Sequence, residues 1–190
     1  YLIKTSEEIN DFSICPTIIQ SQTYQVTHQV GDLAQGGIVF YVDETGQHGL
    51  VAALEDLPET YEWGCYEEDV NGAGADGISI GTGYQNTMDI VNQGCTTEEG
   101  GITAAQAALD AEINGYSDWY LPSKDELIEM YNTIGNDDLE GDISGFENNW
   151  YWSSSEYNNY NAWDVNFTDG GNTYDFVKFG PGGVRVIRSF

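Results

Sequence analysis

One segment has the residue types and spacing of a calcium-binding loop. Residues 136–147 read NDDLEGDISGFE. In a twelve-residue calcium loop, oxygens from alternate positions surround the ion, and a glycine at position 6 allows a sharp turn. The candidate ligands are Asn136, Asp138, Glu140, Asp142 and Glu147. Ca²⁺ is the one cofactor that the sequence suggests; the alternative is an acidic surface loop, because position 1 is Asn and a strand-like stretch follows Glu147. A second acidic segment, Glu67 to Asp76, fits less well.

Catalytic chemistry is not expected from this chain. The sequence contains no HExxH zinc motif, no phosphate-binding loop followed by lysine and no CxxC pair. His28 and His48 lie outside any nucleophile motif, and His48 falls in a predicted turn. In so acidic a chain, the proximity of two carboxylates carries little information. We therefore predict a protein that binds a ligand and is not an enzyme.

The three cysteines are Cys15, Cys65 and Cys95. A bridge between Cys65 and Cys95 would close a loop of about 30 residues and stabilise the fold by about 3–4 kcal/mol in an oxidising compartment. Cys15 would then be free, buried or paired with another chain.

The C-terminal stretch, residues 150–190, has the composition of a recognition surface. Apolar anchors alternate with Asn, Ser, Asp and Gly and with tyrosines. Tyrosine offers a large amphipathic contact area with few torsions to order, and the small polar residues supply hydrogen bonds. We predict a fixed scaffold of Trp150, Trp152, Trp163 and Val184 to Phe190, with Tyr157, Tyr160 and Tyr174 contacting the ligand. The alternative is a loop-rich end of a β domain whose aromatic residues fill the core.

The charge balance limits the partners. The chain has 32 acidic and five basic residues, for a formal net charge of -27. Such a chain would be repelled by nucleic acid, and no apolar run reaches the roughly 20 residues that span a bilayer. This acidity is typical of a secreted, salt-adapted or calcium-holding protein, or it only confers solubility. The chain also starts at Tyr1 instead of Met, as expected for a processed product or a fragment.

The first core elements are predicted to be strands. Residues 17–26 alternate in a strand-like way within an N-terminal arm, residues 1–30, which completes the domain's own sheet or adds to that of a neighbour. Residues 36–42 and 49–53 read as a hairpin of two apolar strands. The arm and the region 31–190 are the two units we expect.

Three helices are predicted next. They begin after Thr82, Thr103 and Ser123, and they end at Gly94, near Gly115 and near Thr133. In the first helix, Tyr84, Met88 and Val91 share one face. Strands and turns return from Trp150 onward, and the terminal strands are expected to share a sheet. The fold class is therefore α+β.

Several side chains are predicted to anchor the core. The extended segment 117–122 should hold the last two helices through Trp119 and Leu121. Arg185 and Arg188 lie in an apolar terminal strand, where each guanidinium needs a carboxylate partner because unpaired burial costs several kcal/mol.

The sequence resembles the Lcl C-terminal-like domains, a bacterial family related to the C-type lectin and formylglycine-generating-enzyme folds. The matching segments are GDLAQGGIVFYVDETGQHGLVAA, WGC, IGTGYQNTMDIV, GYSDWYLPSKDELIEMYNTIG, NNWYWSSSEY, NAW and VRVIRSF, across roughly residues 31–190. The resemblance implies a C-type lectin-like fold: a small twisted antiparallel sheet with flanking helices and a long loop-rich region. The copper-binding cysteine pair of the formylglycine-generating enzymes has no counterpart, so no activity is carried over.

Some relatives in this resemblance are variable proteins of diversity-generating retroelements. In these proteins, mutagenesis directed at adenines rewrites Asn-type codons near the C-terminus, so that Asn becomes Tyr, Ser, Asp and other residues. The positions that look like products of such rewriting, and that we predict to bind ligand, are Tyr157, Asn158, Asn159, Tyr160, Asn161, Asp164, Asn166, Thr168, Asn172, Tyr174 and Asp175.

The sequence therefore predicts an extracellular ligand-binding or adhesion module on a cell or virion surface. Its ligand would be a protein, peptide or glycan on another surface. The alternative is a structural subunit of a surface filament or appendage, assembled through residues 1–30.

Overall fold

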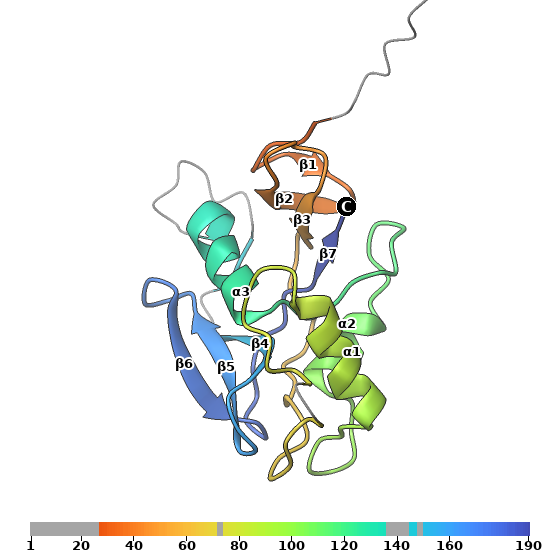
Figure 1. The fold of residues 1–190 in the computed structure, drawn as a ribbon, viewed down its shortest axis with the longest axis vertical. Coiled ribbons are helices and arrows are strands. Elements are labelled where there is room, and N and C mark those ends of the chain that lie inside the picture. Colours follow the sequence, from red (N-terminus) through yellow and green to blue (C-terminus); the bar gives the residue numbers. More distant parts are fainter. Residues whose placement is uncertain (1–26, 72–73, 136–144, 148–149) are drawn as a thin grey trace, which may run out of the picture.

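The computed structural model describes residues 27–71, 74–135, 145–147 and 150–190, and it contains two antiparallel sheets with a short helix between them (Figure 1). The first sheet has the order β1-β2-β3-β7, and the second has the order β4-β5-β6. The strands are β1 (Leu33–Ala34), β2 (Gly37–Val42), β3 (Gly49–Ala52), β4 (Trp150–Glu156), β5 (Asn161–Asn166), β6 (Asn172–Val177) and β7 (Ile187–Ser189). The mixed helix and sheet content agrees with the predicted α+β class.

The predicted hairpin and terminal strand form the first sheet. β2 and β3 pair in antiparallel fashion, and β7 adds to β3 with Val51 opposite Arg188. Ile38, Phe40 and Leu50 are buried in one apolar cluster with residues of the third helix and the second sheet. The prediction that the terminal strand joins an early sheet is confirmed, but β4–β6 form a sheet of their own.

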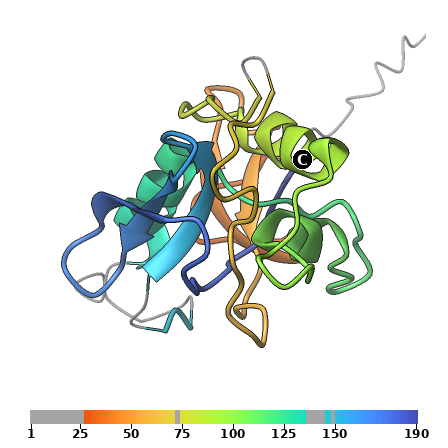
Figure 2. The same ribbon diagram turned by 90° about the horizontal axis from the view of Figure 1, so that it is seen from below.

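The three helices are α1 (Gly83–Gln93), α2 (Ala104–Leu109) and α3 (Lys124–Met130), and a π-helical turn, η1 (Tyr131–Gly135), extends α3. α1 and α2 lie together on the side of the molecule opposite β6 (Figures 1 and 2). α3 begins with the predicted capping box, in which Ser123 and Glu126 bond reciprocally to each other's backbone. α1 ends at Gly94, as predicted, and this glycine has a left-handed conformation.

Two helix predictions are wrong in detail. α2 stops at Leu109 instead of near Gly115, because the chain turns back at once and Ile113 bridges to Tyr116. In α1, Tyr84 is exposed, and the buried face carries Gly83, Asn86, Thr87 and Ile90. The polar members of this face are held by specific acceptors: Asn86 Nδ2 donates to the Gly77 carbonyl (2.6 Å) and Thr87 Oγ1 to the Gly83 carbonyl (2.7 Å).

The predicted anchors are buried and partnered. Trp119 and Leu121 are fully buried in the cluster that packs α1 and α2. Arg188 donates two hydrogen bonds to Asp118 (2.7 and 2.8 Å), and Arg185 donates to Asp56 (2.5 Å). Both guanidinium groups thus have the carboxylate partners that their burial requires.

A disulfide joins Cys65 to Cys95, as predicted. Cys15 and the strand predicted at residues 17–26 lie outside the described residues. Within the described ranges, no helix has both the length and the apolar character that a membrane span requires.

Candidate functional site

The second sheet places several aromatic side chains and one carboxylate on a common face. In its register, Trp152 lies opposite Asp164, Asp164 opposite Tyr174, and Ala162 opposite Phe176. Directly paired residues of neighbouring strands project from the same face of a sheet. Trp152, Asp164, Tyr174 and Phe176 therefore share a face, although they come from three different strands.

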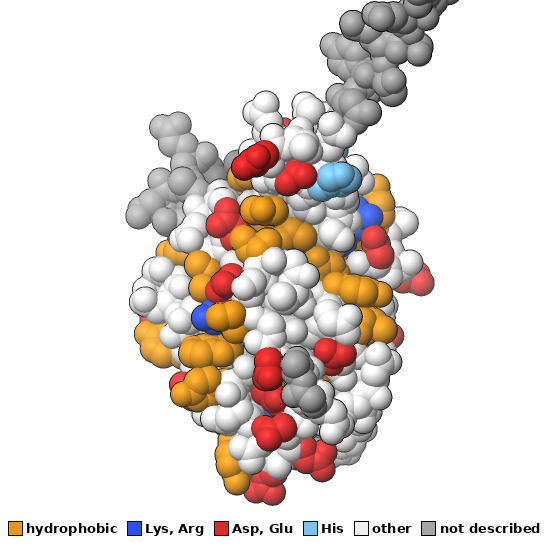
Figure 3. Space-filling model, in the orientation of Figure 1, with side chains coloured by type: hydrophobic (Ala, Val, Ile, Leu, Met, Phe, Trp, Pro, Cys, Tyr) orange, Lys and Arg blue, Asp and Glu red, His pale blue; other side chains and the backbone are white. Residues whose placement is uncertain are grey.

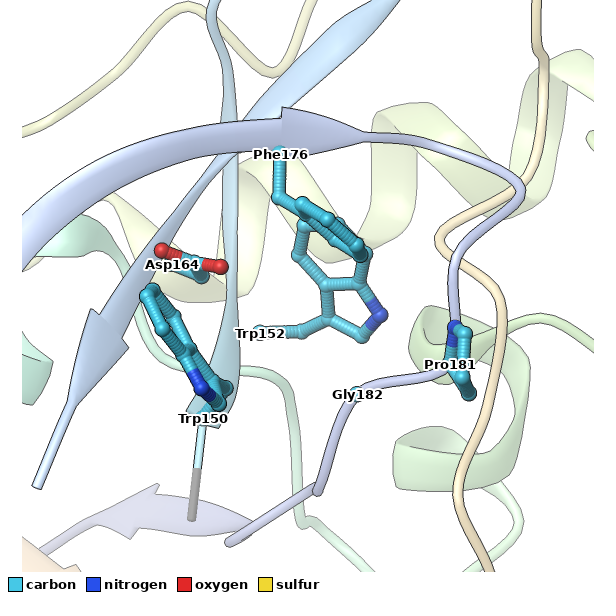
Figure 4. A pocket seen from close by; sticks show the side chains of 6 residues that line it. All are labelled: Trp150, Trp152, Asp164, Phe176, Pro181 and Gly182. Atoms are coloured by element: carbon cyan, nitrogen blue, oxygen red, sulfur yellow. The ribbon is translucent and has the colours of Figure 1, made fainter. Parts of the chain in front are cut away.

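This face carries a cavity of about 250 Å³ (Figure 4). Its lining residues are Trp150, Trp152, Asp164, Phe176, Pro181 and Gly182. Figure 4 shows the rings of Trp152 and Phe176 next to each other, Trp150 beside Asp164, and the Pro181–Gly182 segment closing the opposite side. We call this the β4–β6 cavity.

The aromatic wall is held in place from behind. Trp152 is 1% exposed, and its Nε1 donates to the Tyr61 carbonyl (2.8 Å). Tyr61 and Gly182 also form a pair of backbone hydrogen bonds (2.9 and 3.0 Å), which brings the chain against the indole. A Cβ at Gly182 would lie 2.6 Å from the Trp152 ring, so this approach requires glycine.

The rim of the cavity is open. Trp150 is 40% exposed and Phe176 43% exposed. The ring of Tyr174 lies 5.1 Å from that of Trp150, and the ring of Phe176 lies 5.9 Å from that of Trp152, measured between centroids. A ligand that enters the cavity would therefore meet two exposed rings before it reaches the buried indole.

Asp164 is the unusual member of the lining. Its side chain is 2% exposed, and Oδ1 has no hydrogen-bond partner among the described residues. Burial raises the pKa of the Asp164 carboxyl to about 7; the nearby Asp175 and Asp169 carboxylates add to the shift, and the backbone of Tyr174 opposes it. A buried polar group without a partner costs about 1–3 kcal/mol.

The basic side chains that the structure describes are engaged elsewhere. Lys178 bonds to Glu156, Arg185 to Asp56 and Arg188 to Asp118, while Lys124 lies 3.8 Å from Asp125 and 4.8 Å from the centroid of the Trp163 ring. Across the described residues, Asp164 therefore has no cationic side chain as a partner.

The predicted scaffold of tryptophans is partly wrong. Trp152 is buried as expected, but Trp150 is exposed at the rim of the cavity and Trp163 is half-buried. Trp163 does not reach the cavity because consecutive residues of β5 project from opposite faces, and Trp163 lies on the face opposite Asp164. There its ring lies 4.8 Å from that of Tyr157.

The residues predicted to bind ligand do not form one continuous face. Tyr157, Tyr160 and Tyr174 are all exposed, but they lie in different places. Tyr160 lies at the end of a hairpin near Tyr66, with 5.8 Å between ring centroids, and only Tyr174 lies beside the cavity. A ligand-binding role for the eleven predicted residues stays a prediction.

Several of the predicted polar residues shape turns. The Asn158 side-chain oxygen accepts from the backbone N–H groups of Tyr160 (2.8 Å) and Asn161 (2.9 Å). The Asn166 side chain accepts from the Thr168 backbone N–H (2.8 Å). These bonds are typical of Asx turns, so the sequence signal of Asn at these positions includes a local structural role.

The predicted calcium ligands Asn136, Asp138, Glu140 and Asp142 lie outside the described residues. Glu147 is described and exposed, and its carbonyl accepts a hydrogen bond from the Tyr151 hydroxyl (3.0 Å). No group of three or more His, Cys, Asp or Glu side chains suited to a metal occurs in the described part of the chain. Calcium binding at residues 136–147 stays a prediction.

One short motif matches a catalytic pattern by its letters alone. Residues 77–81 read GISIG, which fits GxSxG. In a nucleophile elbow the serine lies between a strand and a helix. Here the residues directly before Ser79 do not form a strand, and the Ser79 carbonyl accepts hydrogen bonds from Thr82 Oγ1 (2.8 Å) and Ser123 Oγ (3.0 Å). The segment thus connects the N-terminal ends of α1 and α3.

Comparisons with known proteins identify a family. The family model described as the Lcl C-terminal domain matches residues 61–188, about two thirds of the chain. Among solved structures, a fimbrial protein from Bacteroides ovatus ATCC 8483 is similar, with 18% sequence identity and a TM-score of 0.45. The match covers 74% of this chain and 35% of that one, so the chain spans about a third of the length of that protein. No curated protein matches the sequence.

Proposed function

Because the chain belongs to the Lcl C-terminal domain family, we propose that it is an extracellular ligand-binding module and that the β4–β6 cavity is its binding site. The observation that carries this proposal is the buried Asp164 carboxylate at the wall of an aromatic cavity, because its Oδ1 has no hydrogen-bond partner among the described residues. The described protein groups therefore do not compensate the burial of this oxygen. A bound ligand that pairs with Asp164 would remove that cost.

Binding without catalysis fits the lining. Besides Asp164, the lining consists of Trp150, Trp152, Phe176, Pro181 and Gly182, none of which is a nucleophile or a general acid or base. Acid–base chemistry at a single carboxylate would need a second titratable group in reach of the substrate. The aromatic rings instead supply contact area, as in many small-molecule sites.

We place the module outside the cell and assign it a C-type lectin-like arrangement. The Cys65–Cys95 disulfide and the net charge of -27 suit an oxidising extracellular environment. In the long connection between β3 and α1, the described residues form no helix and no sheet strand, and they contact β4, where Trp63 Nε1 donates to the Ser153 carbonyl (2.8 Å), as in a lectin-like loop region. Acidic side chains are spread over the face in Figure 3, and basic ones are few.

The predicted diversification would act at the rim of this site. Tyr174 and Asn172 lie on the cavity face of β6, at the positions opposite Asp164 and Asn166. Rewriting these exposed positions would change the ligand and leave the buried indole of Trp152 in place. A gene that lacks both a near-identical template repeat and a neighbouring reverse transcriptase would contradict this part of the proposal.

One observation favours filament assembly as a second function. β6 is an edge strand of the β4-β5-β6 sheet, and most of its side chains are exposed. An edge strand can accept a strand from another chain, and residues 1–30 would supply it. The test compares the solution mass of the full chain with that of a chain starting near Gly31. Polymers lost on truncation support assembly, and monomers in both samples contradict it.

The binding site itself can be tested by nuclear magnetic resonance. The ¹⁵N-labelled chain is titrated with a set of small sugars, amines and amino-acid derivatives, and the indole N–H signals of Trp150 and Trp152 are followed. We expect at least one compound to shift both indole signals, and Phe176→Ala to weaken that shift. Tyr157→Ala, on the opposite face, is the matched control. If compounds bind and shift neither indole N–H signal, the binding site is not the β4–β6 cavity.

A further inference from the structure

We propose that the β4–β6 cavity binds a quaternary or methylated ammonium group carried on an alkyl chain. This inference rests on the proposed function, since it takes the cavity to be the binding site. It names the chemical class of the ligand, which the family assignment does not.

Charge complementarity is the first argument. A cation placed among the rings would lie close to the buried Asp164 carboxylate, for which the described residues provide no cationic partner. The faces of Trp and Phe rings attract a cation, most strongly where water is excluded. The net charge of -27 adds a long-range attraction for cations.

The same domain already holds one ammonium group in this way. Lys178 is fully buried, and its Nζ lies 4.8 Å from the centroid of the Trp63 ring and bonds to the Glu156 carboxylate. Its Nζ also donates to the carbonyls of Glu68 (2.8 Å) and Cys65 (3.3 Å). A primary ammonium has three N–H donors, and here all three have acceptors.

The β4–β6 cavity differs in its acceptors, and this difference selects the kind of ammonium. Asp164 is the one lining side chain that accepts hydrogen bonds strongly; the indole N–H groups of Trp150 and Trp152 are donors only. A primary ammonium in the cavity would leave N–H donors unpaired, which is unfavourable where water is excluded. A quaternary ammonium has no N–H group, so one carboxylate and several rings satisfy it.

Size and polarity disfavour the other ligand classes. The volume of about 250 Å³ lies below the roughly 300–1,000 Å³ of clefts that enclose a drug-sized ligand, so the cavity suits a single head group. A sugar ring would need several hydrogen-bonding partners for its hydroxyls, and a neutral apolar group would leave Asp164 uncompensated. The head group could come from a choline-bearing surface or from a methylated lysine, which share this chemistry.

The test titrates the full chain at pH 8 with choline, tetramethylammonium, n-butylammonium and 3,3-dimethyl-1-butanol, the neutral analogue of choline. The readout is the pair of Trp150 and Trp152 indole N–H signals. We expect choline and tetramethylammonium to bind at least about tenfold more tightly than the other two, a difference of about 1.4 kcal/mol. Equal affinity for choline and its neutral analogue, or tighter binding of butylammonium, would overturn the inference.

Variants separate the roles of charge and ring. Asp164→Asn keeps the shape, removes the charge and should weaken choline binding at least about tenfold. Phe176→Leu should weaken it several-fold, which keeps the test decisive if the first variant folds poorly. Asp110→Asn is the matched control, because this exposed carboxylate accepts a hydrogen bond from Gln106 (2.8 Å) at the end of α2, outside the cavity, and should leave the affinity within about twofold. Unchanged affinity in Asp164→Asn would contradict the proposal.

Two further outcomes distinguish this inference from the proposed function. A sugar or neutral compound that shifts both indole signals while choline does not would overturn the inference and leave the cavity as the binding site. Absence of any ligand at the two indoles would overturn both. If choline binds, two comparisons show which source carries the group. Binding to phosphatidylcholine vesicles and not to phosphatidylglycerol vesicles indicates a choline-bearing surface. Binding to a trimethyllysine peptide and not to the same peptide with lysine indicates a methylated lysine.

Discussion

Two buried carboxylates lie on neighbouring strands of the same small sheet, and their surroundings differ. Glu156 on β4 is 7% exposed and Asp164 on β5 is 2% exposed. The Glu156 carboxylate accepts from Lys178 Nζ and from the Val70 backbone N–H (3.1 Å). Asp164 Oδ1 accepts from none of the described residues.

This difference separates a structural charge from the one that we propose to bind ligand. Burial raises the pKa of Glu156, and the hydrogen bond from Lys178 opposes that shift. At Asp164, burial dominates and no described cation opposes it. The fold thus compensates one buried carboxylate internally, and the other lies at the wall of a cavity, where a ligand can compensate it.

Breaking the compensated pair should have the largest effect on stability. Lys178→Met leaves Glu156 buried without its cationic partner, and loss of one partner of a buried ion pair costs about 3–5 kcal/mol. Urea unfolding followed by tryptophan fluorescence measures the free energy of unfolding.

The double variant Glu156→Gln, Lys178→Met is the matched control. It removes both charges, so we expect it to recover most of the loss. A single variant that loses less than about 1 kcal/mol would contradict a structural role for this pair.

The disulfide supports the compensated site and should come next in size. The Cys65–Cys95 bridge holds the loop whose carbonyls, those of Cys65 and Glu68, accept from Lys178. Replacing both cysteines by alanine should lower the free energy of unfolding by about 3–4 kcal/mol. Reducing agent should lower the melting temperature of the native chain and not that of the variant. Equal stability of the two chains would contradict this role.

Local signals in the sequence were sufficient for much of the fold. The two apolar runs at residues 36–42 and 49–53 predict the β2–β3 hairpin, and Ser123 with Glu126 marks the start of α3. Both signals depend on residues close in sequence. A buried guanidinium requires a carboxylate, so the sequence also predicts that Arg188 is paired, as the structure confirms. The partner, Asp118, could not be named, since it lies 70 residues away.

The cavity could not be predicted, because it depends on long-range register. Trp152 meets Asp164 only through the β4–β5 pairing, and Gly182 approaches the indole through a separate bridge to Tyr61. Asp164 was among the predicted ligand-binding residues, but it was chosen because it lies in an Asn- and Tyr-rich stretch and not because a cavity was foreseen. Consecutive strand residues project from opposite faces of a sheet, so Trp163 and Asp164 could have been assigned to different faces from the sequence of β5. The predicted single binding face would then have been divided into two.

Asp164→Asn should raise the free energy of unfolding at neutral pH, by less than the Lys178 and cysteine variants lower it. An unfolded Asp loses its proton near pH 4, whereas the folded Asp164 keeps it until about pH 7. The folded state binds more protons in this window, so the contribution of Asp164 to stability falls as pH rises from about 4 to 7. The Asn variant lacks this loss and should exceed the native chain by about 1–3 kcal/mol at pH 8.

Unfolding curves at pH 4.5, 6 and 8 measure this difference, and Asp175→Asn is the control for the loss of a nearby negative charge. A saturating ammonium ligand should reduce the difference between Asp164→Asn and the native chain at pH 8, since ligand binding stabilises only the chain that binds it. A difference that does not change with pH would show that Asp164 is compensated in solution.

The exposed tyrosines should have the smallest effect on stability, and they test whether the two faces of the sheet differ in function. Tyr174→Ala and Tyr157→Ala each remove one exposed ring contact, with Trp150 and Trp163 respectively, and each should change the free energy of unfolding by less than about 1 kcal/mol. Their effects on ligand affinity should separate: Tyr174→Ala, beside the cavity, should weaken choline binding about two- to fivefold, and Tyr157→Ala should leave it unchanged. Isothermal titration calorimetry of both variants measures this. Equal losses would show that ligand contacts extend over both faces of the sheet, as the sequence alone had suggested.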